Sequence, residues 1–313
     1  MQKRVNYNKD NKMNRTKFFI LSIVILTGAV LQAQTNLLNA KTPQEIGKLS
    51  VEKQMADNDK PLEYGYIDDR DIYWSKVVWE YMDLNERLNL PYYYPIDTMS
   101  ISTDRRSLYD TLLRGIKQGK ITEVYDDSYF TSKLSINEIE EKLYRKDTIA
   151  EGIDVLNADP NADISEYIDV YNIDSEHIEG YKIKGVWYID KRQGEMKYRL
   201  LGIAPVAQDV QTIGRDDIGD INEKLPIFWV FYPNARQIMH DMKVFNPNNA
   251  AFPISFDHLL NAHRFSSLIY KEENVYGDRE VKNYVKGNSL FQVLESEKLK
   301  EDIRNKELDL WNY

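Results

Sequence analysis

Hydrophobic and polar positions follow helical spacing in the first half of the chain. Residues 68–89 carry apolar side chains three and four positions apart, which predicts a helix. This helix should end before Pro91, because the residue that precedes a proline avoids the helical region. A second helix is predicted from Ser102 or Thr103, both good N-caps, to Gly119.

Shorter sequence patterns predict the remaining elements of the first half of the chain. The sequence of residues 135–138 is a capping box, in which Ser135 and Glu138 would each bond to the other's backbone, and it predicts the start of a third helix. Residues 121–125 predict a short strand before it. Residues 154–175 are rich in Asp and Asn, which favours a surface excursion.

Strand periodicity appears in the centre of the chain. Residues 181–189 and 196–200 alternate apolar and polar positions around a short polar turn, which predicts an antiparallel hairpin. Residues 225–232 are nearly all apolar and predict a further strand. The remaining predicted elements are a short helix capped by Ser255, an extended stretch over residues 265–270, and a last helix from Asn288 or Ser289 toward Leu310.

These elements predict an α+β fold, with helices plus an antiparallel sheet in a single compact domain that has an extended N-terminal arm. No strand-helix-strand unit with a glycine fingerprint recurs, which argues against a doubly wound nucleotide-binding fold. The expected organisation is a signal peptide (1–33), an extended arm (34–67), the α+β domain (68–288) and a C-terminal helical tail (289–313).

The first 33 residues have the pattern of a secretory signal peptide. Basic residues precede an almost wholly apolar run, residues 18–31, and small-residue positions follow it, with cleavage expected after Ala33. The run is about 14 residues long, short of the ~20 that a membrane-spanning helix needs. Met13 would give a more conventional signal than Met1. We therefore expect an exported protein without a membrane span.

Composition agrees with an ordered, acidic, exported protein. An apolar fraction of 42% can form a core, and the 29% of charged residues mix both signs along the chain of 313 residues. The formal net charge is −9; removal of six Lys or Arg and one Asp with the signal peptide would make it −14. Nucleic acid is a poor partner at that charge. With no cysteine, disulfides, thiol catalysis and lipid attachment through cysteine are excluded.

No catalytic, cofactor or metal site is predicted. His258 and His263 are five positions apart, about 140° around a helix, so they would not share a face as zinc ligands four apart do. The acidic turn 159–163 begins like a calcium loop, but Ile164 stands where the loop needs glycine and Val170 where it needs a bidentate carboxylate. The other two histidines are His177 and His240, and residues 287–289 supply an incomplete nucleophile elbow.

Trp79 is the least expected residue of the first predicted helix. At about 100° per residue the apolar stripe falls on one face, whereas Trp79 falls opposite it, among the charges of Asp83 and Arg87. Either the helix is buried on both sides, or Trp79 is a binding anchor inside a charged rim. The candidate partner interface comprises Ile72, Trp79, Asp83, Arg87, Tyr92, Tyr93 and Tyr94.

Several segments, in the same order, resemble the GldN/PorN proteins of Bacteroidetes over about residues 65–285. They are DRDI (69–72), WSKVVWE (74–80), DLNER (83–87), YRLLGIAP (198–205), WVFYP (229–233), FDHLL (256–260) and RF (264–265).

The resemblance implies a periplasmic, non-enzymatic structural subunit of the type IX secretion and gliding motility machinery. Such proteins form rings, with self-association inside the ring, together with an outer-membrane lipoprotein, GldK/PorK. They also contact GldM/PorM, which is anchored in the inner membrane. The family supplies no catalytic motif or cofactor to transfer. The protein would then be periplasmic and associated with the outer membrane through its partner.

A competing interpretation is an exported carbohydrate or peptidoglycan binding protein, or a hydrolase that uses carboxylates without a recognisable motif. Its support is the count of 22 tyrosines and the row formed by Tyr92, Tyr93 and Tyr94, because aromatic rings stack on sugar faces. Binding of cell-wall fragments to the isolated protein would distinguish it from an assembly subunit.

Overall fold

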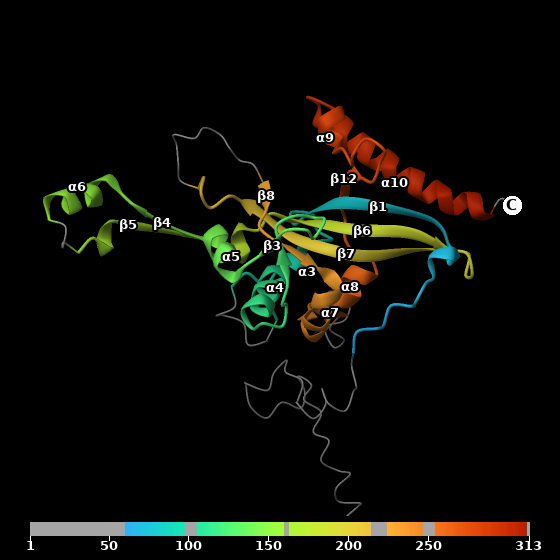
Figure 1. Ribbon diagram of the computed structural model, residues 1–313, viewed down its shortest axis with the longest axis horizontal. Coiled ribbons are helices and arrows are strands. Elements are labelled where there is room, and N and C mark those ends of the chain that lie inside the picture. Colours follow the sequence, from blue (N-terminus) through green and yellow to red (C-terminus); the bar gives the residue numbers. More distant parts are fainter. Residues whose placement is uncertain (1–59, 98–104, 160–162, 214–223, 247–253, 312–313) are drawn as a thin grey trace, which may run out of the picture. The chain divides into compact units, whose positions relative to one another are not determined.

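A computed structural model of the chain describes residues 60–97, 105–159, 163–213, 224–246 and 254–311 (Figure 1). The expected signal peptide and residues 34–59 of the expected arm lie outside these ranges. So do Ser102 and Thr103, the N-caps predicted for the second helix, and part of the acidic turn.

The described fold is α+β, which confirms the predicted class. Its main antiparallel sheet has eight strands in the order β12-β1-β6-β7-β9-β2-β3, with β8 paired to β7. The strands are β1 (Ile72–Asp83), β2 (Val124–Tyr125), β3 (Lys133–Leu134), β6 (Gly180–Asp190), β7 (Glu195–Gln208), β8 (Lys224–Pro226), β9 (Trp229–Phe231) and β12 (Leu268–Glu272). Two smaller sheets pair β4 (Tyr144–Thr148) with β5 (Ile168–Asn172) and β10 (Lys243–Val244) with β11 (Ile254–Ser255).

Eight α-helices accompany these strands in the described ranges. They are α3 (Leu90–Tyr93), α4 (Leu108–Lys117), α5 (Ile136–Leu143), α6 (Ala150–Ala158), α7 (Tyr232–Asp241), α8 (Phe256–Asn261), α9 (Val281–Tyr284) and α10 (Ser289–Trp311). Short 3-10 turns include η2 (Asp69–Asp71), directly before β1.

The prediction of a helix over residues 68–89 is wrong, because most of this stretch forms the long strand β1. β1 pairs with β6 along most of its length and with β12 near its end. Its aromatic and β-branched residues suit a strand. A strand buried on both faces carries apolar residues on both, so its sequence does not alternate between apolar and polar positions. The apolar positions of β1 then match helical spacing by coincidence.

Helix boundaries differ from the predictions in the same region. Pro91 does not end a helix: it lies in the first turn of α3, where its missing N–H costs no hydrogen bond. The described N-cap of α4 is Ser107, whose side chain accepts a hydrogen bond from Asp110 N at 3.1 Å. Gly119 follows the end of α4 with a φ of 68°, as predicted for a helix-terminating glycine.

Four predicted elements are confirmed. The capping box of α5 is formed by Ser135 and Glu138. The hairpin is formed by β6 and β7, and it is longer than the alternating residues indicated. The last helix is α10, where Asn288 Oδ1 accepts from Leu290 N at 3.0 Å at its start. The helix capped by Ser255 is also present, as α8.

The structure adds detail to two predictions in the centre. Except for Ile173, the described residues of 154–175 are exposed or half-buried, in keeping with a surface excursion, and they have regular structure: the end of α6 and the strand β5, which pairs with β4. The strand predicted over residues 225–232 is divided into β8 and β9, and Tyr232 already begins α7. The extended stretch over 265–270 becomes a strand only from Leu268.

Helices and sheet enclose three apolar clusters. The largest joins α4, α7 and α8 to the sheet through residues such as Leu112, Tyr232 and Ile203. A second cluster joins α10 to β1 and β12 through Leu299, Val78 and Ile269, and Figure 1 shows α10 running alongside these strands. The third contains Trp79, Tyr125, Ala204 and Trp229.

Candidate functional site

The seven residues proposed as a partner interface do not form one exposed surface. Trp79 is 2% exposed and Tyr92 is fully buried, with its hydroxyl donating to Arg264 O at 3.0 Å. Asp83 ends β1 and accepts a hydrogen bond from Asn85 N at 2.9 Å. Of the seven, Arg87 and Tyr94 are exposed, and Ile72, Asp83 and Tyr93 are half-buried.

Trp79 lies among charges because the sheet register places them there. Lys184 on β6 and Lys271 on β12 are the residues opposite Trp79 on its two neighbouring strands. Their ammonium groups lie 5.0 Å and 4.4 Å from the centre of the indole, and both also lie over the ring of Tyr129. Burial lowers the pKa of both lysines, and for Lys184 the charge of Lys271 lowers it further. Trp79 is therefore a buried partner of the protein's own cations.

The segment that enters the sheet, residues 60–67, is here called the strap. It has neither helix nor strand, and three arginines bind its backbone carbonyl oxygens. The three hydrogen bonds run from Arg236 to Leu62 (2.5 Å), from Arg199 to Gly65 (3.1 Å) and from Arg192 to Tyr66 (3.2 Å).

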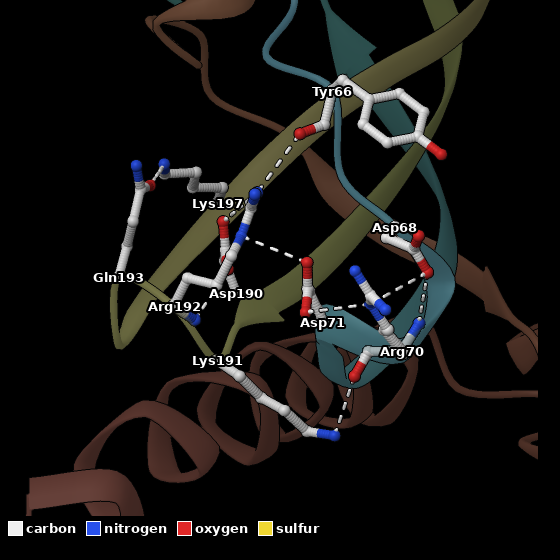
Figure 2. Close-up of polar contacts among 9 residues, drawn as sticks. All are labelled: Tyr66, Asp68, Arg70, Asp71, Asp190, Lys191, Arg192, Gln193 and Lys197. Atoms are coloured by element: carbon white, nitrogen blue, oxygen red, sulfur yellow. Dashed lines mark hydrogen bonds and ion pairs between the residues drawn. The ribbon is translucent and has the colours of Figure 1, made fainter.

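Figure 2 shows where the strap joins the turn between β6 and β7. Arg192 lies 3.3 Å from the carboxylates of both Asp71 and Asp190, and its hydrogen bonds lower the pKa of Asp190. Lys191 donates from Nζ to Arg70 O at 3.0 Å and from its backbone N to Asp71 O at 2.8 Å. The turn η2 is thereby fixed to the hairpin at the point where the strap ends.

Tyr64 is the strap side chain that enters the body of the protein. The guanidinium groups of Arg236 and Arg199 both lie over its ring, at 4.1 Å and 4.7 Å from the ring centre. Its hydroxyl donates to Asn261 Oδ1 at 2.7 Å, and burial raises its pKa, which keeps the donating proton in place. Arg199, Arg236 and Asn261 are here called the Tyr64 socket.

A buried carboxylate fixes the socket from behind. Asp257 binds Arg236 through both of its oxygens, at 2.9 Å and 3.1 Å. It also accepts from Tyr232 Oη at 2.9 Å and from Asn261 Nδ2 at 2.7 Å. Because Asp257 is 4% exposed and fully bonded, the socket is pre-organised for the ring and carbonyls that it receives.

Sequence reasoning did not find the strap and its socket. The hydrogen-bonded partners are 126, 134 and 174 residues apart, and they come from the hairpin turn, from β7 and from α7. Each arginine alone has the appearance of a surface charge. No local spacing in the sequence brings them together, so only the tertiary fold reveals them.

A second polar cluster, around Glu80, contains a serine, a histidine and a carboxylate, which raises the question of catalysis. Ser267 Oγ bonds to Glu80 Oε2, and His263 Nε2 lies 3.3 Å from the same oxygen. In a nucleophilic triad the histidine instead lies between the hydroxyl and the carboxylate. Here the carboxylate lies between them, so the hydroxyl has no contact with the base that would activate it.

Lys300 of α10 closes this cluster by donating to Ser267 O at 2.5 Å. Beside it is a cavity of about 320 Å³ lined by residues that include Trp187, Met196 and Ile303. Burial acts to raise the pKa of Glu80, but the bond and charge of His263 and the Ser267 hydroxyl outweigh it and hold that pKa below its ordinary value. The cluster therefore keeps a charged carboxylate beneath α10.

Within the described ranges, no three histidine or carboxylate side chains are grouped so that they could hold a metal ion. None of the described helices combines the length and apolar character needed to cross a membrane.

Comparison with known proteins gives one family. The family model described as gliding motility associated protein GldN matches residues 67–312, which includes β1, the hairpin, the socket and α10. Comparison with curated proteins gives no match. The match covers most of the chain and the segments whose resemblance was noted from the sequence. The chain therefore belongs to the GldN family of gliding motility associated proteins.

Proposed function

We propose that this protein is a non-enzymatic structural subunit of the type IX protein secretion system, which supports protein export and gliding motility. The observation that carries the proposal is the GldN family match over residues 67–312. The order of the groups around Glu80 supports a structural role, because the serine hydroxyl bonds to the carboxylate and not to the histidine.

The subunit would work in the periplasm, exported by the signal peptide expected over residues 1–33. Its proposed partners are an outer-membrane lipoprotein of the GldK/PorK type and an inner-membrane-anchored protein of the GldM/PorM type. It would form a ring with the lipoprotein and further copies of itself. A negative net charge of −9 before export favours basic surfaces on these partners through long-range attraction.

Two of the seven residues proposed from the sequence as a partner surface are exposed to solvent. They are Arg87 and Tyr94, and Tyr94 is 55% exposed. The row of three tyrosines that supported sugar binding does not present three faces to solvent, because Tyr92 is fully buried and Tyr93 is half-buried. No specific observation now favours the carbohydrate-binding alternative.

The proposal is tested by deleting the gene and restoring it with a C-terminally tagged chain. We expect the deletion to abolish gliding and secretion, and the tagged chain to co-purify with the lipoprotein from outer-membrane extracts as rings visible by electron microscopy. Restoration with Tyr73→Ala is the matched control, because Tyr73 is 63% exposed and should be dispensable for folding. Normal secretion by the deletion strain would refute the proposal.

A further inference from the structure

We propose that a groove between α4, α5 and the start of β4 binds a segment of a different protein, in which apolar residues are flanked by Lys or Arg. The groove has a volume of about 330 Å³. It is here called the acidic groove, and its apolar lining residues are Leu113, Ile116, Ile136, Ile139, Leu143 and Tyr144. The inference rests on the proposed function, because it assigns a surface to one of the partner contacts proposed above.

The first step is how the sequence forms this groove. In α5, Ile139 and Leu143 are buried in the largest apolar cluster, whereas Ile136 in the first turn is 56% exposed. Tyr144 directly follows α5 and is 42% exposed. The other helix, α4, contributes the buried side chain of Ile116. The acidic groove therefore has a buried apolar floor and exposed apolar side chains at its rim.

The second step is that the apolar rim continues onto the small sheet of β4 and β5. The residue pairs on one face of this sheet are Tyr144–Asn172, Lys146–Val170 and Thr148–Ile168. Val170 is 55% exposed on that face. The opposite face is fixed to the body of the protein, because Arg145 is buried and donates to Val210 O and Ile213 O, both at 2.7 Å. A two-stranded sheet is marginally stable alone, so further packing on its exposed face would stabilise it.

The third step is the charge around the groove, which selects the kind of partner. Residues 136–174, which include α5, β4, α6 and β5, contain eleven Asp or Glu and three Lys or Arg. Their net charge is therefore −8, compared with −9 for the whole chain. Two of the three basic residues are already paired, Lys142 with Asp126 and Arg145 with Asp147. Nearly all of the net negative charge thus surrounds the acidic groove.

This charge distribution favours one class of occupant. A basic protein surface is attracted over a long range, whereas nucleic acid and anionic lipid are repelled. A second copy of this chain has the same net charge of −9 and is repelled as well. The occupant that fits is therefore a different chain, with apolar side chains in the groove and Lys or Arg over its rim.

The apolar part of the contact is tested with Ile136→Glu. This change places a charge at the rim, and the exposed position makes it compatible with folding. The matched control is Leu308→Glu on α10, where the side chain is 55% exposed and does not line the groove. Circular dichroism and thermal unfolding will establish that both variants fold.

The charged part is tested with the double variant Glu140→Lys and Glu141→Lys. Both positions are exposed, and lysine suits the C-terminal half of a helix such as α5. The matched control is Glu301→Lys with Asp302→Lys, at two exposed positions of α10. It changes the net charge of the chain by the same amount at a helix that does not line the groove.

The binding probes are the purified periplasmic parts of the proposed lipoprotein and of the proposed inner-membrane-anchored protein, each titrated separately by calorimetry. We expect one of them to bind the wild-type chain. Ile136→Glu and the α5 double variant should each raise its Kd at least about tenfold, as loss of a central interface contact does. Both α10 controls should bind like the wild type.

Salt dependence separates the two parts of the contact. Raising the salt concentration from about 50 to 500 mM should weaken binding of the wild type and of Ile136→Glu, because screening removes the long-range attraction. The α5 double variant should respond less to salt, since part of that attraction is already gone.

The proposal would be overturned if neither probe bound the wild-type chain, or if the groove variants bound as tightly as the wild type. Equal weakening by the α10 double variant would also overturn it, because the effect would then belong to net charge and not to the groove. Loss of self-association in Ile136→Glu, with unchanged binding of the probes, would assign the groove to a second copy instead.

These outcomes are separate from a failure of the proposed function. A partner that binds through the groove, together with normal secretion by the deletion strain, would refute the function and leave the groove assignment standing. Loss of secretion on deletion, with Ile136→Glu binding both probes like the wild type, would do the reverse.

Discussion

At the scale of single residues, Trp79 is surrounded by charge on a buried surface. The ammonium groups of Lys184 and Lys271 lie over its ring, and Lys271 Nζ donates to Tyr129 Oη at 2.8 Å. The indole thus compensates part of the cost of burying Lys184 and half-burying Lys271. Removing it would leave both a large cavity and poorly solvated charges.

We therefore expect Trp79→Ala to lower the free energy of unfolding by about 3 to 5 kcal/mol, the range for loss of a large buried side chain. Urea unfolding followed by circular dichroism measures this change. The control is Tyr73→Ala on the same strand, where the ring is 63% exposed and the cost should stay below about 1 kcal/mol. A stable Trp79→Ala protein that fails to bind its partner would instead restore the anchor interpretation.

Glu80 gives the second prediction at this scale. Its pKa is lowered in the folded protein, so its stabilising effect is complete above its ordinary value of 4.5 and is lost as the pH falls through the folded value. Glu80→Gln should remove this part of the acid sensitivity and cost about 1 to 3 kcal/mol at pH 7. Unfolding free energies of both proteins between pH 3 and pH 7 provide the test. A difference between them that does not narrow below pH 4.5 would contradict it.

At the scale of elements, the sequence predicts those whose determinants are local. The capping box of α5 lies within four residues, and the hairpin of β6 and β7 follows from alternation around one turn. β1 could not be predicted in this way, because what buries its two faces comes from far along the chain. Glu80 and its partner Ser267, for example, are 187 residues apart. The strap and its socket were not predicted from the sequence for the same reason.

The β6–β7 hairpin contains a close approach that gives a prediction for this scale. A methyl group on Gly185 would lie 2.2 Å from the hydroxyl of Tyr198 on β7. Tyr198 cannot easily move, because its ring packs against Trp187 and His263 at 4.9 Å and 4.5 Å between ring centres.

Gly185→Ala should therefore destabilise the protein by about 1 to 3 kcal/mol through overpacking. Thermal unfolding provides the measurement. Gly65→Ala is the matched control, since a methyl group there meets no described atom within 4 Å and should change stability little. Equal stability of the two variants would mean that the hairpin accommodates the added carbon by shifting Tyr198.

At the scale of the whole molecule, the proposed export would determine which residues the working protein contains. If the signal peptide is removed after Ala33, the mature chain begins at Gln34, and its net charge becomes −14. The strap would then follow a 26-residue segment that starts at the new N-terminus.

We expect N-terminal sequencing of protein from a periplasmic extract to begin at Gln34. A variant with two charged residues in the apolar run, Leu21→Arg and Ile25→Arg, should remain inside the cell with its original N-terminus, because the run would no longer be apolar. Recovery of Met1 or Met13 at the start of wild-type periplasmic protein would refute cleavage.

The pairing of β1 with β12 determines the order in which a growing chain can complete its sheet. β1 and the hairpin leave the ribosome before β12 and α10, which follow them in the chain. Until then, one edge of β1 has no strand beside it and Val78 lacks its apolar cover. An open edge of this kind pairs readily with other unfinished chains. A nascent chain that still lacks β12 and α10 therefore exposes both this strand edge and the apolar surface around Val78.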